Sequence, residues 1–390
     1  MNRFRITKAC RVCFLPLLAI AIAGCLGSSD QPARTSNTSR GPSPDPNPSP
    51  SPAIAQKDPA PTETGPKVIR PGPRAFATEP SDQKANARTP RAIARLEPDI
   101  AAPREPGAAF TEKLEGYRTP AEYLVLKSRH VPSAIAAIGL PVDYGQDPAR
   151  TYPLVIAFGG AGECARPPRD GALAWIGYYK TDQAMVALKN NKLQASDFRG
   201  LASAQEVREF NKRLEAHPFQ GVILACPYSP PLTAGGRLED PDYELFIMEE
   251  LIPSLIKHYR VAPGMIGVDG VSMGGTRSMY YGFKYPDIFR SIGSLQGSFS
   301  PFMDQYRELV VKNRALLKDR SIQLVTSDRD YLAPSVKKMS RMLESEGIPH
   351  SYLVLGGPHD YIFNQGPGSL ALLVFHNQAL NTASPSPKRR

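Results

Sequence analysis

Every second residue from Pro42 to Pro52 is a proline, and this run limits where a folded domain can begin. Proline fixes φ and has no backbone N–H, so the run excludes helix and favours extended polyproline II. Seventeen of the 40 prolines lie between Leu26 and Phe110, where aromatic residues are almost absent. Such a segment cannot bury enough apolar surface to offset its conformational entropy. We therefore predict a disordered, proline-rich tether over residues 25–110.

The rest of the chain is long enough for one sizeable core, and its charge is nearly balanced. Residues 116–387 hold 28 basic and 26 acidic side chains, although the whole chain of 390 residues carries +10. A nucleic-acid-binding domain concentrates positive charge on its folded face, so this balance excludes nucleic acid as a partner. We predict one globular domain over residues 111–382 and a basic flexible tail over residues 383–390.

The N-terminus has the pattern of an export signal. Residues 1–24 combine four basic side chains with an apolar run, Val12–Ala23, that is too short to span a bilayer comfortably. Ile22–Cys25 resembles the lipobox of bacterial lipoproteins, which implies that Cys25 is lipidated and begins the mature chain. An ordinary cleaved signal with a chance cysteine is the alternative. We expect an exported lipoprotein of the cell envelope, at the outer membrane or cell surface, that faces the periplasm or the exterior.

Cysteine and histidine usage predicts neither a metal nor a cofactor. Only Cys164 and Cys226 fall in the globular part of the chain. In an exported protein they can form a disulfide or remain two separately buried thiols, and both readings stay open. No Cys/His cluster has zinc-ligand spacing, and the six histidines are scattered.

Apolar runs alternate with segments of helical periodicity along the globular part. Tyr152–Phe158 and Gly221–Cys226 are typical of buried strands, each ending near glycines or a polar loop. Together with opening strands at 123–127 and 134–141, the predicted series is helix Asp242–Tyr259, strand Met265–Val271, helix Gly274–Tyr285, strand Ser291–Leu295, helix Phe302–Leu317, strand Ile322–Thr326, helix Pro334–Glu346, strand Tyr352–Leu355 and helix Ser369–Leu380. This alternation predicts an α/β fold with a mostly parallel central sheet and helices on both faces.

Gly270-Val271-Ser272-Met273-Gly274 matches G-x-S-x-G between a predicted strand and a predicted helix. A sharp strand-to-helix turn exposes the serine hydroxyl, and the flanking glycines avoid clashes with neighbouring backbone. The amide of Met273 then faces the carbonyl oxygen of an attacked substrate. We interpret Ser272 as a nucleophile; a Gly/Ser-rich structural turn is the alternative.

A nucleophilic serine needs a base, and His359 lies in the loop after the last predicted strand. The alternative reading is a solvated loop side chain. The remaining histidines lack this setting, since they fall on helices, in polar connections or before a strand: His130, His217, His258, His350 and His376.

The third member of such a triad is an acid that orients the histidine and stabilises the imidazolium. Asp328 and Asp330 both follow the strand Ile322–Thr326. We favour Asp330, because the strand has ended there, and keep Asp328 as the alternate. Either aspartate can instead cap the helix that follows.

The oxyanion of the reaction needs a second backbone donor besides Met273. The glycine-rich loop after Tyr152–Phe158 lies where such a donor is expected, and Gly160 and Ala161 are both candidates. A phosphate loop is the other reading of these glycines, but no Gly-Lys-Ser/Thr follows.

Three segments, Glu250–Tyr259, Gly270–Gly275 and Tyr285–Phe289, resemble the putative-esterase group of the α/β-hydrolases. That group includes esterase-D-like enzymes, feruloyl and acetyl xylan esterases, siderophore esterases and mycolyltransferases. The resemblance implies the α/β-hydrolase fold and fits Asp330 and Gly356–Asp360 to the acid and histidine positions of the group.

The chain departs from that family in two places. Phe158 stands where a His-Gly pair usually opens the oxyanion loop. The connection Cys164–Phe219 is long and polar, with predicted helices at Trp175–Lys189 and Ala204–Leu214. We expect this connection to form part of a substrate cleft or lid.

The sequence therefore predicts an exported, lipid-anchored serine carboxylic-ester hydrolase that works through an acyl-enzyme. Feruloyl or acetyl esters of polysaccharides suit an exported enzyme on a long tether, while siderophore and other small esters stay open. An acyltransferase with the same triad, a peptidase, and a non-catalytic surface binding module are the alternatives.

Overall fold

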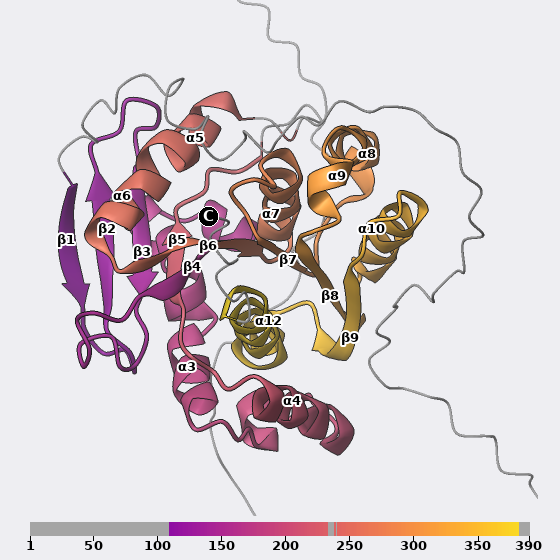
Figure 1. Ribbon diagram of the computed structural model, residues 1–390, viewed down its shortest axis with the longest axis horizontal. Coiled ribbons are helices and arrows are strands. Elements are labelled where there is room, and N and C mark those ends of the chain that lie inside the picture. Colours follow the sequence, from indigo (N-terminus) through magenta and orange to yellow (C-terminus); the bar gives the residue numbers. More distant parts are fainter. Residues whose placement is uncertain (1–108, 233–237, 239, 382–390) are drawn as a thin grey trace, which may run out of the picture. The chain divides into compact units, whose positions relative to one another are not determined.

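The computed structural model describes residues 109–232, 238 and 240–381 (Figure 1). The predicted signal peptide, the lipidation site Cys25, the tether up to residue 108, the last residue of the predicted domain (382) and the predicted tail over residues 383–390 lie outside the described residues. Strand β1 begins at Ala109, two residues before the predicted start of the domain. The sequence did not predict this strand, because a strand with four of its six side chains exposed has no run of apolar residues.

One nine-stranded sheet runs through the described residues in the order β1-β2-β3-β5-β4-β6-β7-β8-β9. Strands β1 to β3 are antiparallel to their neighbours, and from β5 to β9 all pairs are parallel. The prediction of a mostly parallel central sheet is therefore confirmed. The strands are β1 (Ala109–Leu114), β2 (Ala121–Leu126), β3 (Ile135–Gly139), β4 (Tyr152–Phe158), β5 (Ile223–Pro227), β6 (Val261–Gly270), β7 (Ser291–Leu295), β8 (Ser321–Arg329) and β9 (Ser351–Pro358).

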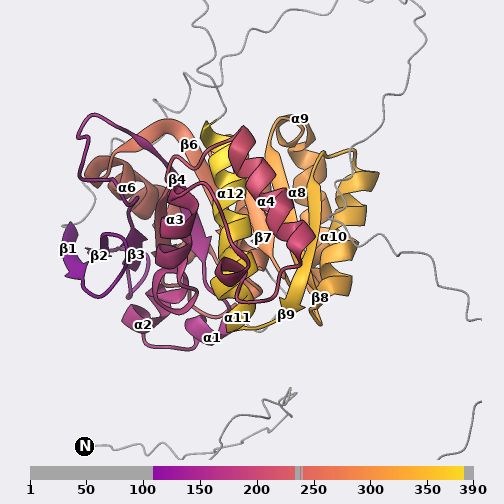
Figure 2. The same cartoon turned by 90° about the horizontal axis from the view of Figure 1, so that it is seen from below.

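Helices cover both faces of the sheet, and Figure 2 shows α3, α4 and α12 together on one of them. That face carries α3 (Thr181–Lys189), α4 (Ala204–Ala216) and α12 (Ser369–Asn381), and the opposite face carries α5 (Pro241–Leu245), α6 (Ile252–His258), α7 (Met273–Lys284), α8 (Met303–Lys312), α9 (Arg314–Leu317) and α10 (Ala333–Ser345). Short elements complete the set: α1 (Ala161–Cys164), α2 (Pro168–Ala172), α11 (Tyr361–Phe363), 3₁₀ turns at Ala195–Phe198 and Ser300–Phe302, and π-helical stretches at Ala174–Tyr178, Phe246–Leu251 and Asn364–Gly368.

The central strands are buried on both faces, because side chains alternate between two cores. In β4, Leu154, Ile156 and Phe158 pack on the α7 side, whereas Val155 and Ala157 pack on the α12 side. This is why β4 reads as an unbroken apolar run rather than as an alternating one.

Two predicted helices are interrupted. The segment 242–259 consists of α5, a π-helical stretch and α6, and Pro253 stands at the second residue of α6. The segment 302–317 breaks at Asn313, whose side-chain amide donates to the carbonyl of Phe283 at 2.7 Å. An asparagine that hydrogen-bonds outside its own helix competes with helix continuation.

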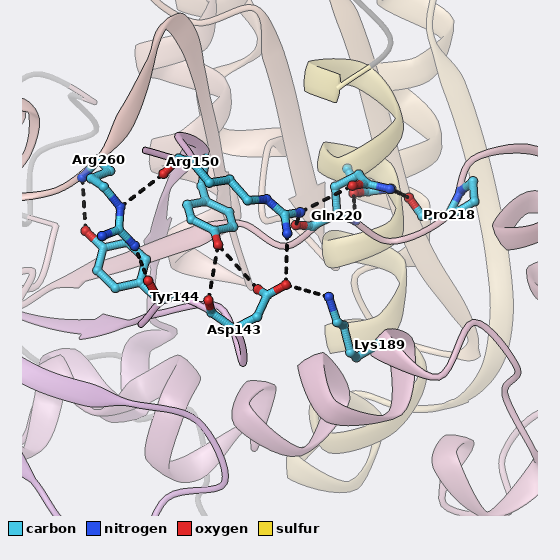
Figure 3. Close-up of polar contacts among 9 residues, drawn as sticks. Asp143, Tyr144, Arg150, Lys189, Pro218, Gln220 and Arg260 are labelled. Carbon is cyan, nitrogen blue, oxygen red and sulfur yellow. Dashed lines mark hydrogen bonds and ion pairs between the residues drawn. The ribbon is translucent and has the colours of Figure 1, made fainter. Parts of the chain in front are cut away.

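A polar cluster links segments at the amino-terminal ends of the parallel strands β4 and β5 (Figure 3). Asp143, in the connection before β4, accepts from Arg150 at 2.9 Å and from Lys189 of α3 at 2.6 Å. Arg150 also donates to the carbonyl of Gln220 at 2.6 Å. Burial alone would raise the pKa of Asp143, but the bond from Lys189 and the charge of Arg150 lower it below its usual value. The cluster joins the β3–β4 connection to α3 and to the segment before β5, at the edge opposite to the predicted active site.

Two further findings concern the described residues alone. Cys164 and Cys226 are both buried free thiols, so they do not form the disulfide that the sequence left open. None of the helices in the described ranges combines the length and the apolar character needed to cross a bilayer.

Candidate active site

Ser272 stands in a strained turn between β6 and α7. Its backbone has φ 55° and ψ −115°, a region that residues with a side chain rarely adopt. The Ser272 amide donates to the carbonyl of Leu295 at 2.9 Å, at the end of β7. The predicted strand–turn–helix arrangement around Ser272 is therefore present, at the C-terminal edge of the parallel strands.

The turn depends on backbone contacts that leave no room for a Cβ atom. A Cβ on Gly274 would lie 2.3 Å from the carbonyl oxygen of Phe158, and one on Gly270 would lie 2.3 Å from the backbone of Gly274. The first turn of α7 thus packs directly against the end of β4. This contact holds Ser272 beside the loop that follows β4.

His359 and Asp330 form a hydrogen-bonded pair at the ends of β9 and β8. Nδ1 of His359 lies 2.8 Å from Oδ1 of Asp330, whose side chain is buried. Asp330 also accepts from Thr326 Oγ1 at 2.7 Å and from the amide of Leu332 at 2.8 Å. Because a carboxylate only accepts, Nδ1 carries the proton in the neutral ring and Nε2 is the free acceptor.

Asp328, the alternate acid, lies elsewhere. Its side chain is 60% exposed and accepts the amide of Gly357 at 2.8 Å. It therefore fastens the end of β9, two residues before His359, and has no contact with the histidine ring. β8 extends to Arg329, further than predicted, and Asp330 is still the first residue after it.

Ser272, Asp330 and His359 follow the ends of β6, β8 and β9. These ends lie at one edge of the sheet, because β6, β7, β8 and β9 are parallel neighbours. Gln296, after β7, links the ends of β8 and β9: its Nε2 donates to Ser327 Oγ at 2.7 Å and to the carbonyl of Pro358 at 3.1 Å. No hydrogen bond joins Ser272 and His359 in these described residues. Catalytic hydrogen bonds are commonly long without substrate and tighten in the complex.

The two candidates for the second oxyanion donor differ in their hydrogen bonding. The amide of Gly160 donates to Tyr179 Oη at 3.2 Å in a buried position. Ala161 opens α1 and Met273 opens α7. The first amides of a helix have no intrahelical acceptor and remain free for a ligand. The Gly160 amide is therefore occupied, and Ala161 is the better candidate.

Sequence reasoning missed a buried carboxylate beside this loop. Glu163 in α1 is 3% exposed, and it accepts the hydroxyls of Tyr179 and Tyr361. Burial, and then the charge of Glu163, raise the pKa of Tyr179 well above its usual value. Tyr179 lies 16 positions after Glu163 and Tyr361 lies 198 positions after it, and no local motif reveals such a spacing.

An exposed aromatic ring covers the histidine. Tyr331 is 72% exposed, and its ring centroid lies 4.6 Å from that of His359. Tyr331 is thus available to a ligand as well as to His359.

A second Ser-His-Asp cluster lies inside the core. His376, on α12 as predicted, is fully buried; Nδ1 lies 2.7 Å from Ser291 Oγ and Nε2 lies 3.0 Å from Asp269 Oδ2. Burial raises the pKa of Asp269, whose other oxygen accepts the amide of Gly270. In the described ranges, no group of three His, Cys, Asp or Glu side chains is arranged to hold a metal ion.

Part of the chain matches a known protein family. Residues 228–336 match the family model described as "Putative esterase", a stretch that includes Ser272 and Asp330 and ends before His359. This match confirms the resemblance found in the sequence. No curated protein matches the chain.

Three solved structures illustrate what the chain is similar to. A ferulic acid esterase is 17% identical with a TM-score of 0.49, over 70% of this chain and 100% of that one. An S-formylglutathione hydrolase from Agrobacterium tumefaciens is 15% identical with a TM-score of 0.43, over 69% and 98%. The fluorophosphonate-binding serine hydrolase FphF of Staphylococcus aureus is 12% identical with a TM-score of 0.44, over 69% and 99%.

Proposed function

We propose that this chain, which carries a putative-esterase domain and is a carboxylic ester hydrolase, cleaves its substrate through Ser272, His359 and Asp330. One observation carries the assignment of these residues. The 2.8 Å bond between His359 and Asp330 leaves Nε2 as the acceptor, at the same sheet edge as a serine held at positive φ. A serine in a strained turn, a histidine and a buried acid have the roles that acyl transfer needs.

In the proposed reaction, Ser272 Oγ attacks the ester carbonyl carbon and its proton passes to His359 Nε2. The negative charge that develops on the carbonyl oxygen is stabilised by the amides of Met273 and Ala161, which open two helices. The alcohol leaves with the proton from His359. Water then attacks the acyl-enzyme as His359 takes its proton; the bond to Ser272 Oγ breaks, His359 returns the proton to Oγ, and the carboxylic acid leaves. Asp330 stabilises the imidazolium and remains ionised throughout.

For the substrate we propose an aromatic acyl ester, such as a feruloyl group on a polysaccharide, in preference to an acetyl ester. The supporting observation is Tyr331, because a ring that is 72% exposed beside His359 can stack on an aromatic acid. Comparison of feruloyl and acetyl esters on the Tyr331→Ala variant tests this. We expect kcat/KM to fall about tenfold on the feruloyl ester and to change little on the acetyl ester. An equal fall on both esters would contradict the proposal.

Export and lipid anchoring are also proposals, and they rest on the sequence. The basic and apolar pattern of residues 1–24, followed by Cys25, supports a lipoprotein anchored in the cell envelope. Growth with radiolabelled palmitate tests this proposal: the wild-type chain should carry label and Cys25→Ala should not. An unlabelled wild-type chain would contradict lipid anchoring and would favour an ordinary cleaved signal peptide.

The catalytic proposal is tested with the full-length protein and a Ser272→Ala control, by release of p-nitrophenol from its acetate and butyrate. Ser272-dependent turnover is the expected result, together with labelling of Ser272 by a fluorophosphonate. A folded protein that neither turns over nor becomes labelled would favour a non-catalytic binding module on the same fold. Product analysis with sugar acceptors distinguishes hydrolysis from acyl transfer, since the triad is the same in both.

A further inference from the structure

Glu163 is a buried carboxylate that belongs to neither the nucleophile, the base nor the acid of the proposed site. It lies in α1, two residues after Ala161, and 3% of its surface is exposed. Its two oxygens accept hydroxyl groups from different parts of the chain: Oε2 from Tyr179 and Oε1 from Tyr361. A buried carboxylate is costly unless it is hydrogen-bonded, so these two bonds hold all three side chains in place.

Tyr179 connects Glu163 to the oxyanion loop. Its Oη accepts the amide of Gly160 at 3.2 Å while its own proton goes to Glu163. The ring is 2% exposed and packs edge-on against Trp175, with centroids 5.0 Å apart. Trp175 in turn donates to the carbonyl of Phe158 at 3.0 Å. The amide of Gly160, one residue before Ala161, is therefore held by Tyr179, and Tyr179 is held by Glu163.

Tyr361 connects Glu163 to the histidine loop. It follows His359 by two residues and begins α11, and its hydroxyl donates to Glu163. The approach is close, since a Cβ on Gly162 would lie 3.5 Å from Tyr361 Oη. A hydrogen bond to Tyr361 also raises the pKa of Arg166, which stacks on the Tyr178 ring at 4.4 Å. The loop after β9 is thus fastened to α1 by a bond across 198 residues of sequence.

We propose that Glu163 is a positioning residue that keeps the oxyanion loop and the histidine loop in register, through Tyr179 and Tyr361. The proposal rests on the function proposed above, because it needs Ala161 and His359 to act on the same substrate. Catalysis depends on the distance between these groups, and a misplacement of about 1 Å can lower the rate about a hundredfold. Since Glu163 does not touch the reacting atoms, its loss should lower kcat and leave KM nearly unchanged.

The experiment uses the full-length protein with Tyr361→Phe, Tyr179→Phe, the double variant and Glu163→Gln. Tyr285→Phe is the matched control, because Tyr285 donates to Glu244 at the far end of α7 and its loss also removes a tyrosine–carboxylate bond. Steady-state kinetics on p-nitrophenyl butyrate and the rate of fluorophosphonate labelling are measured for each variant, with thermal unfolding as a check on folding.

We expect Tyr361→Phe to lower kcat about tenfold and Tyr179→Phe somewhat more, with KM within about twofold of wild type and Tyr285→Phe unchanged in both. If both tyrosines act through Glu163, the double variant and Glu163→Gln should resemble Tyr179→Phe alone. Activity of Tyr361→Phe equal to that of Tyr285→Phe would overturn the proposal, as would effects that simply multiply in the double variant. Wild-type protein without Ser272-dependent turnover or labelling would overturn the proposed function itself, and this inference with it.

Discussion

The part of the chain that the structure describes contains two clusters of serine, histidine and aspartate, and they differ in position, burial and hydrogen bonding. Ser272, His359 and Asp330 follow strand ends at the sheet edge, and the histidine side chain is 14% exposed. The other cluster, hereafter the core cluster, joins two strands to α12 and is fully buried: Asp269, Ser291 and His376.

The two histidines also bind their aspartates through different ring nitrogens. In the cluster at the sheet edge (Ser272, His359 and Asp330), Nδ1 of His359 bonds the acid and Nε2 is free. In the core cluster, Nδ1 of His376 bonds the serine and Nε2 bonds the acid, so both ring nitrogens are occupied. A base needs a free acceptor within reach of a substrate, and His376 has neither. The same residue types thus fasten a helix in one place and are arranged for chemistry in the other.

The largest test of this contrast replaces each serine with alanine. Ser272→Ala should lower kcat by about 10⁵-fold, because it removes the nucleophile, whereas Ser291→Ala should keep it within about threefold of wild type. Hydrolysis of p-nitrophenyl butyrate by purified, folded variants measures both. Equal losses in the two variants would mean that the core cluster takes part in catalysis.

The acid gives the next largest effect. Asp330→Asn should lower kcat by about 10⁴-fold, because an amide favours the wrong histidine tautomer. Asp328→Asn removes an exposed carboxylate that accepts the Gly357 amide and pairs with Arg329 at 3.7 Å, without contacting His359, so we expect a change of about twofold. The two variants are compared in the same kinetic assay. The reverse order would exchange the roles of the two aspartates.

Substitutions in the core cluster should lower the stability of the protein rather than its activity. Asp269→Asn breaks a fully buried pair, and we expect the free energy of unfolding to fall by about 3 kcal/mol. The folded fraction should keep its kcat. Urea unfolding followed by circular dichroism measures the loss, and His359→Gln, measured alongside, should lose activity with little loss of stability.

The Asp143 cluster provides a third kind of polar group for the comparison, an ion-paired carboxylate whose contribution to stability depends on pH. The pKa of Asp143 is lower in the folded than in the unfolded chain, so its contribution to stability is present above its unfolded pKa and lost as the pH falls through the folded value. Asp143→Asn should therefore cost about 1 kcal/mol at pH 7. The difference from wild type should shrink below about pH 4. Unfolding curves at pH 7 and pH 3 measure it; a constant difference would point to packing rather than charge.

The local parts of the fold could be predicted from the sequence. β7 and the turn around Ser272 have signals that span a few residues, because a buried parallel strand is continuously apolar and a sharp turn needs glycine. Asp330 was accessible to the same reasoning, since its position depends on where β8 ends.

The missed features depend on contacts between distant segments. Glu163 looks like a surface residue of a short polar helix until Tyr361 reaches it. His376 pairs with a residue 107 positions away, and its helical neighbours gave no sign of a polar partner. Gln296 joins three strand ends whose proximity exists only in the folded sheet. Burial and pairing of polar groups are set by topology, which single-residue patterns do not encode.

The close packing of Gly274 on the end of β4 has a consequence for protein engineering. Because a Cβ there would overlap the carbonyl oxygen of Phe158, any larger residue must push α7 away from the loop that carries Ala161. A mutant library built to alter substrate range should therefore hold Gly270 and Gly274 constant. Diversity belongs at exposed positions such as Tyr331, beside His359, where a side chain can change without moving the backbone.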